Sequence, residues 1–123
     1  MRGRLIKAVA TVVMIGMWAC QAGAEPLLNE VLKEYDNPNT SETRRAVISS
    51  NLAGVGLGLG WANTAVRVQR MQAGLYCPPD QPEMAAAQLI DILRRAVKDE
   101  PRLGDRPLGF AVLAALQRSF PCK

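Results

Sequence analysis

The residues of this chain best suited to covalent chemistry are two of its three cysteines, Cys77 and Cys122. Cys77 is followed by two prolines and an amphipathic segment, and Cys122 is the penultimate residue. The third cysteine, Cys20, lies in an N-terminal segment typical of an export signal. An exported chain that keeps one pair of cysteines is expected to join them in a structural disulfide. Cys77 and Cys122 also flank one predicted helical hairpin, so we predict that they bond to each other.

Other catalytic chemistry has little support in the sequence. The chain contains no histidine, which removes the commonest general base and the commonest metal ligand. Ser49 and Ser50 have no evident base to activate them. Asp99 and Glu100 form an adjacent carboxylate pair, but a solvated turn explains them better than catalysis. We therefore predict no catalytic residue, metal ligand or cofactor, and a binding protein in place of an enzyme.

Residues 1–24 have the features of a cleaved secretory signal. Arg2, Arg4 and Lys7 form a basic start, and an uncharged, mostly apolar stretch runs from Ala8 to Ala19. The small residues at 22–24 form a cleavage site. Cleavage after Ala24 would leave residues 25–123 as one small domain, and we predict that this domain is periplasmic.

Two alternatives to simple cleavage stay open. A retained anchor would need about 20 apolar residues to span a bilayer, whereas this segment has only about 12. The second alternative is a lipoprotein whose signal is cleaved before Cys20, although bulky Trp18 occupies a position where such signals usually have a small residue.

The charge of the chain does not indicate nucleic-acid binding. Three of its 15 basic residues lie in the leader, and all 11 acidic residues lie after it. Residues 25–123 therefore carry a net charge near +1. The pairs Arg44-Arg45 and Arg94-Arg95 have acidic neighbours and resemble solvated helix faces.

Hydrophobic periodicity predicts an all-α fold, a small four-helix domain cross-linked by one disulfide. The expected helices span residues 26–35, 41–73, 82–98 and 106–119, and no segment is a convincing strand. Expected N-caps are Asn39 or Thr40 for the second helix, Asp80 for the third and Asp105 for the fourth.

The second helix contains two rows of residues spaced seven apart, as at the seam between packed helices. The rows are Val47, Gly54, Trp61 and Val68, and Ser50, Leu57, Thr64 and Met71. Glycines alternate from Gly54 to Gly60, and each costs about 1 kcal/mol relative to alanine inside a helix, so a kink or break is expected there.

Three interpretations compete for these glycines. They could form a phosphate-binding loop, although no strand precedes them. They could belong to a membrane-spanning helix, because Ala46 to Val66 contains no charge and the glycines fit a small-xxx-small pattern. The third and favoured interpretation is a buried helix that packs closely against another helix at its glycines.

Several motifs, in this order, resemble the Rap/Tai-type immunity proteins of type VI secretion. They are Ala53-Gly54-Val55-Gly56, Gly60-Trp61-Ala62-Asn63, Tyr76-Cys77-Pro78-Pro79, Gln88-Leu89, the turn at Pro101 and Phe120-Pro121-Cys122. The resemblance covers most of the predicted mature chain and is densest over residues 50–122. It implies an all-helical periplasmic protein, often a dimer, that binds and blocks a peptidoglycan-cleaving amidase, with Cys77 and Cys122 as its disulfide.

An inhibitor of this kind must reach into a concave catalytic cleft, and projecting turns between rigid helices do so well. The turn between the last two helices carries charges of both signs and is expected to project into solvent. The candidate partner-binding residues are Asp99, Glu100, Arg102, Asp105 and Arg106. Two alternative functions are a small periplasmic helical chaperone and a membrane-associated small protein.

Overall fold

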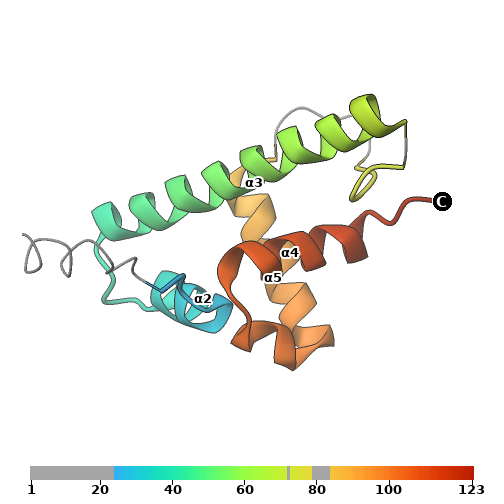
Figure 1. Ribbon diagram of the computed structural model, residues 1–123. Helices are drawn as coiled ribbons and strands as arrows, with labels where there is room; N and C mark the ends of the chain where they lie inside the picture. The colour runs from blue at the N-terminus through green and yellow to red at the C-terminus, as the bar shows by residue number, and fades with distance from the viewer. Residues whose placement is uncertain (1–23, 72, 79–83) are drawn as a thin grey trace, which may run out of the picture.

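The computed structural model describes residues 24–71, 73–78 and 84–123 of the chain. It contains α2 (Leu28–Asp36), α3 (Glu42–Arg70), α4 (Ala86–Asp99), a short 3-10 helix η1 (Pro101–Asp105) and α5 (Leu108–Ser119). These described residues form four α-helices and no strand, and Cys77 is bonded to Cys122. The predicted all-α, four-helix fold with one disulfide is therefore confirmed. Figure 1 shows α3 as the longest helix, lying along one side of the molecule, with α2, α4 and α5 all on the same side of it.

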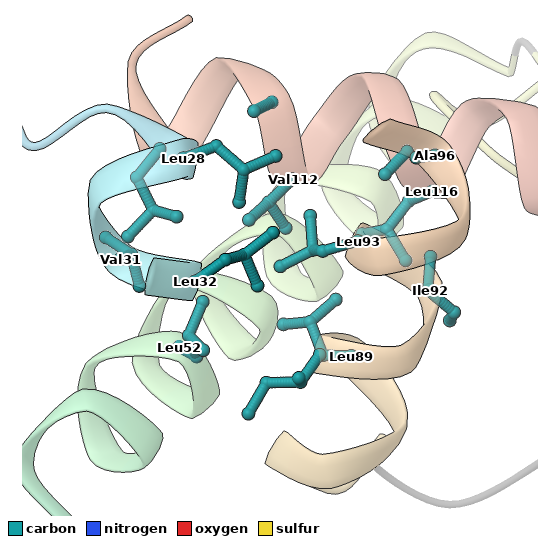
Figure 2. Close-up of a cluster of buried hydrophobic side chains, with 14 of the residues drawn as sticks. Leu28, Val31, Leu32, Leu52, Leu89, Ile92, Leu93, Ala96, Val112 and Leu116 are labelled. Atoms are coloured by element: carbon teal, nitrogen blue, oxygen red, sulfur yellow. The ribbon is translucent and has the colours of Figure 1, made fainter. Parts of the chain in front are cut away.

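The hydrophobic core lies where α2, α3, α4 and α5 meet, and α4 and α5 supply five buried residues each. Figure 2 shows side chains from all four helices pointing into this cluster. The largest fully buried side chains are Leu28, Leu52, Leu89, Ile90, Leu93 and Val112. The apolar residues that recur at helical spacing along α5 are all buried, at Leu108, Ala111, Val112, Ala115 and Leu116. Helical spacing of apolar residues therefore identifies the inward face of α5 correctly.

Helix starts are less well predicted than helix faces. Ser41, not Asn39 or Thr40, is the N-cap of α3, and its Oγ accepts a 3.2 Å hydrogen bond from the backbone N–H of Arg44. The helix expected from residue 82 begins at Ala86, where the Gln88 side chain accepts from the Ala85 N–H. The proposed cap at Asp80 lies outside the described residues.

The start of the last helix differs for a specific reason. Asp105 does not cap α5, because Arg106 and Pro107 are extended and pair with the segment before α2. The N–H of Leu28 donates to the Arg106 carbonyl, and the N–H of Leu108 donates to the Pro26 carbonyl, both at 3.0 Å. The same pairing moves the start of α2 from the expected Pro26 to Leu28.

Two arginines connect α3 to the end of α2. Arg44 donates two hydrogen bonds to the Glu34 carboxylate, and these bonds lower the pKa of Glu34. Arg45 donates to the carbonyls of Tyr35 and Asn37. The hydrogen bonds from Arg44 lower this pKa because they stabilise the ionised carboxylate in the folded protein. Their contribution to folding stability is therefore present above the ordinary pKa of Glu34 and is lost as pH falls through the lowered pKa.

The outer face of α3, defined by the two rows of residues spaced seven apart, points away from the core. All eight residues of those rows are exposed, including Trp61 at 69% and Val68 at 72%. The inward side of α3 is instead formed by Ile48, Leu52, Val55, Leu59 and Asn63. The expectation that the rows form a seam within this chain is therefore wrong.

The glycines of α3 lie inside one continuous helix, so neither a break nor a phosphate-binding loop occurs there. A Cβ added at Gly54, Gly58 or Gly60 would meet nothing within 4 Å, and one at Gly56 would lie 3.5 Å from Leu89. The favoured interpretation of a helix packed tightly at its glycines is therefore wrong within a single copy of the chain.

The segment after α3 folds back onto the end of α5. Asn63, a buried polar residue of α3, forms two hydrogen bonds with the backbone of Tyr76. Burial also raises the pKa of the Tyr76 phenol. Next to it, the Cys77 N–H donates to the Phe120 carbonyl at 2.8 Å, and the disulfide joins Cys77 to Cys122. The disulfide and three hydrogen bonds therefore join Tyr76 and Cys77 to α3 and to the C-terminal segment.

We expect the Cys77–Cys122 disulfide to form under oxidising conditions and to contribute strongly to the stability of the protein. Alkylation without reductant should label neither cysteine, as judged by mass spectrometry. The Cys77→Ser, Cys122→Ser double variant should lose about 3–4 kcal/mol of unfolding free energy, because the bond closes a loop of 45 residues. Gln117→Ala is the control, since it removes only one exposed hydrogen bond to the same segment, from Gln117 Nε2 to the Leu75 carbonyl. Equal denaturation midpoints for the double variant and the wild type would contradict this assignment.

Candidate functional site

The five predicted partner-binding residues lie on and beside η1, between α4 and α5. Asp99 is the last residue of α4, and Glu100 separates that helix from η1. Arg102 and Asp105 lie on η1, and Arg106 directly follows it. The structure thus brings all five to one end of the α4–α5 hairpin.

The turn exposes most of its charged residues, as expected, and it is also anchored to the rest of the fold. Leu103 and Gly104 are buried, with Leu103 in the hydrophobic core, and η1 packs against both α2 and α4. A Cβ on Gly104 would come within 2.3 Å of the Asn29 side chain, so glycine permits the close approach of η1 to α2. Proline at the first position of η1 and the Leu103 N–H to Glu100 carbonyl bond set its short helical turn.

The five side chains have different surroundings. Glu100 is half-buried and forms an ion pair with Arg118 of α5. Asp105 Oδ1 accepts a 3.3 Å hydrogen bond from Asn29 Nδ2 of α2. Asp99, Arg102 and Arg106 are exposed and form no ion pair with any other described residue. Arg102 and Arg106 are therefore the cations of this turn that are best placed to contact a partner.

Two residues that position the turn were not identified from the sequence. Asn29 contacts η1 from α2, and Arg118 neutralises Glu100 from α5. Both lie on helices far from η1 in sequence, so no local motif connects them to it. Their exposed positions on amphipathic helices also resemble ordinary solvated polar residues.

A second group of charges lies on the exposed side of α4. Arg94 forms ion pairs with Asp91 of the same helix and with Asp36 at the end of α2. The pKa of Arg94 is raised, chiefly by its hydrogen bond to Asp36. Arg95 and Lys98 of the same helix are exposed and form no ion pair with any other described residue, so α4 also carries two cations that a partner could contact.

Residues 24–71, 73–78 and 84–123 contain no group of three or more cysteine or carboxylate side chains arranged to hold a metal ion. Nor does any helix there combine the length and the apolar character needed to cross a bilayer.

Comparisons with known proteins add no assignment. No protein-family model, curated protein or solved structure matches this chain. The resemblance to Rap/Tai-type immunity proteins therefore stays a prediction from the motifs.

We expect the anchoring of η1 to depend on Leu103 and not on its charged neighbours. Leu103→Ala should lower the unfolding free energy by about 2–5 kcal/mol, because the leucine is buried and its removal leaves a cavity. Arg102→Ala, the exposed neighbouring position, should change it by less than about 0.5 kcal/mol. Chemical denaturation of both variants checks this expectation, and similar midpoints for the two would show that η1 is not anchored through its leucine.

Proposed function

We propose that this chain is an exported immunity protein of the Rap/Tai type, which binds and blocks a peptidoglycan amidase in the periplasm. The ordered set of motifs suggests the family. The all-α fold and the Cys77–Cys122 disulfide agree with what that resemblance implies. In this proposal the protein acts by binding and not as an enzyme, and residues 1–24 are removed on export.

The observation that carries the proposal is the combination of rigidity and exposure at η1. Leu103 is buried, while the adjacent Arg102 is exposed. A turn fixed in this way can contact another protein without losing much conformational entropy on binding, which favours affinity. Amidase clefts are concave, and η1 presents exposed charged side chains between the ends of two helices, so occlusion of a cleft is the mode of inhibition we propose.

The charges at η1 suggest how a complementary partner would be recognised. Arg102 and Arg106 provide two cations beside Asp99. Charge patterns of this kind contribute more to specificity and association rate than to total affinity. The cognate amidase is therefore expected to carry acidic groups at the rim of its cleft.

Where the neighbouring reading frame encodes a peptidoglycan amidase, we expect charge reversal at Arg102 to weaken binding to that enzyme. Arg102→Glu should raise the dissociation constant at least about tenfold, equivalent to about 1.4 kcal/mol, with unchanged helical content. Lys123→Glu makes the same charge change at the exposed C-terminus and should leave the dissociation constant within about twofold. Isothermal titration calorimetry and peptidoglycan hydrolysis give the two readouts.

The outcomes of this experiment separate the function from the site. If the wild type neither binds the neighbouring amidase nor slows hydrolysis, the proposed function is wrong. If the wild type inhibits and Arg102→Glu inhibits equally well, the contact lies elsewhere, and Arg95→Glu then tests the exposed side of α4.

A periplasmic chaperone is a second candidate, favoured by one observation. The outer face of α3 exposes Leu57, Trp61 and Val68, which are side chains able to bind an unfolded client. If this function is correct, the protein should suppress light scattering by an aggregating client, and Trp61→Glu should lose most of that suppression. No suppression by the wild type at either pH 3 or pH 7 would eliminate this candidate.

A further inference from the structure

Several large apolar side chains that the fold leaves exposed lie in the second half of α3 or directly after it. They form what we call the apolar ridge, which consists of Leu57, Trp61, Val68 and Met71. Met71 is 94% exposed and Leu57 is 48% exposed. Figure 1 shows the other helices on the opposite side of α3, and no described segment covers the ridge. Exposed apolar surface gathered in this way marks a contact with a protein or a membrane.

The ridge is narrow and is surrounded by small residues. Leu57 and Val68 lie four residues before and seven residues after Trp61, so the three side chains lie along one line of the helix. A Cβ added at Gly58 or Gly60 would meet nothing within 4 Å. The bulky side chains therefore project singly from the helix surface. A fluid lipid surface accepts such side chains without a matching pocket, whereas a protein partner must be complementary in shape.

The charge of this part of the chain has one sign. Residues 43–79 contain no acidic residue, and their basic residues are Arg44, Arg45, Arg67 and Arg70. At the start of α3, Arg44 is neutralised by Glu34 of α2. At its end, Arg67 and Arg70 are exposed and form no ion pair with any other described residue. The last turn of α3 therefore offers two cations to an anionic surface.

These two cations lie at the same end of α3 as the most exposed part of the ridge. Arg67 directly precedes Val68 and lies one helical turn before Met71, so its charge is beside the ridge. An apolar helix face that carries tryptophan and is flanked by basic residues is typical of helices that bind at a membrane surface. Charge complementarity therefore favours an anionic bilayer as the occupant of this face.

We propose that the second half of α3 docks on the surface of an anionic lipid bilayer. The apolar ridge enters the boundary between headgroups and acyl chains, and the helix lies in the plane of the surface. Trp61 favours this depth because its ring is apolar and its N–H is polar. Arg67 extends its aliphatic stem over the apolar surface while its guanidinium binds lipid phosphate. This docking does not rest on the proposed amidase inhibition, because η1 and the ridge share no residue.

Attachment of this kind is weak and reversible. Four apolar side chains bury far less surface than a membrane-spanning helix, so the protein exchanges between bound and free forms. The two arginines make the attachment depend on anionic lipid and on salt, because charges at a surface are screened beyond about 10 Å at about 0.1 M salt. Docking therefore has three signatures, which are removal of Trp61 from water, preference for anionic lipid and loss at high salt.

A vesicle titration followed by tryptophan fluorescence tests this docking. The sample is residues 25–123 with the disulfide intact, in which Trp61 is the single tryptophan. Its emission should shift to shorter wavelength on phosphatidylcholine vesicles that contain about 30% phosphatidylglycerol, because docking removes the ring from water. Binding should be at least about tenfold weaker on pure phosphatidylcholine, and it should weaken as NaCl rises from about 50 to about 500 mM.

A matched pair of substitutions, measured by co-sedimentation with vesicles, locates the apolar contact. Trp61→Glu should weaken binding to the anionic vesicles at least about tenfold. Phe110→Glu makes the same kind of change at an aromatic residue of α5 that is 58% exposed, and should change binding by less than about twofold. Circular dichroism should show equal helical content in both variants, since both positions are exposed in the fold.

A second pair of double variants locates the charged contact. Arg67→Gln with Arg70→Gln should weaken binding to the anionic vesicles at least about tenfold and leave binding to pure phosphatidylcholine unchanged. Arg95→Gln with Lys98→Gln removes the same charge from the exposed side of α4, which packs on the opposite side of α3. That control should change binding by less than about twofold, because its charges do not face the lipid.

Three results would overturn the proposal. Absence of wild-type binding at about 5 mM anionic lipid would exclude even a weak attachment. Equal binding of wild type and Trp61→Glu would place the contact on another surface. An emission shift that follows protein concentration or addition of the amidase, with no response to vesicles, would assign the ridge to a second copy or to that enzyme instead.

Discussion

The positions of α3, η1 and α5 depend on the burial of α4. Five residues of this 14-residue helix are buried, and α4 contacts α3, η1 and α5. Leu89 lies between α4 and the inward side of α3, where it is also the nearest side chain to Gly56. Leu93 is fully buried in the centre of the cluster in Figure 2. Because α4 fixes where α3 and α5 lie, it also fixes the two ends that the disulfide joins.

The short helices could be predicted from the sequence because each has only one apolar face. In α5 the stripe from Leu108 to Leu116 has no competitor on the other side of the helix. The α3 helix has two candidate stripes on opposite sides, the seven-residue rows and the stripe of Ile48, Leu52, Val55 and Leu59, and only the second faces the core. The two stripes differ in composition. The stripe that faces the core is entirely aliphatic, whereas the seven-residue rows include glycine, serine and threonine, which bury little apolar area. Spacing alone could not make this distinction.

The candidate site was predicted in position but not in structure. Its charges suggested a solvated turn, and Arg102 and Arg106 are indeed exposed. The sequence gives no sign that Leu103 enters the core, because one leucine between charged residues carries no periodicity. Nor does it indicate that Asn29 and Arg118 lie beside the turn, since those contacts arise only when α2 and α5 pack next to η1 and the end of α4. Tertiary packing therefore converts a polar connector into a fixed projection.

The two candidate surfaces, at η1 and on the outer face of α3, are both fixed by the fold before any partner binds. The turn at η1 is held by buried side chains of its own chain, so its geometry is set before any partner arrives. The outer face of α3 is likewise preformed, because α3 stays helical through four glycines without any contact on that side. The inward contacts of Ile48, Leu52 and Asn63, with the N-cap at Ser41, are what stabilise this helix. The α3 helix can therefore carry residues on its outer face that would destabilise an isolated helix, and that freedom makes the face available for binding.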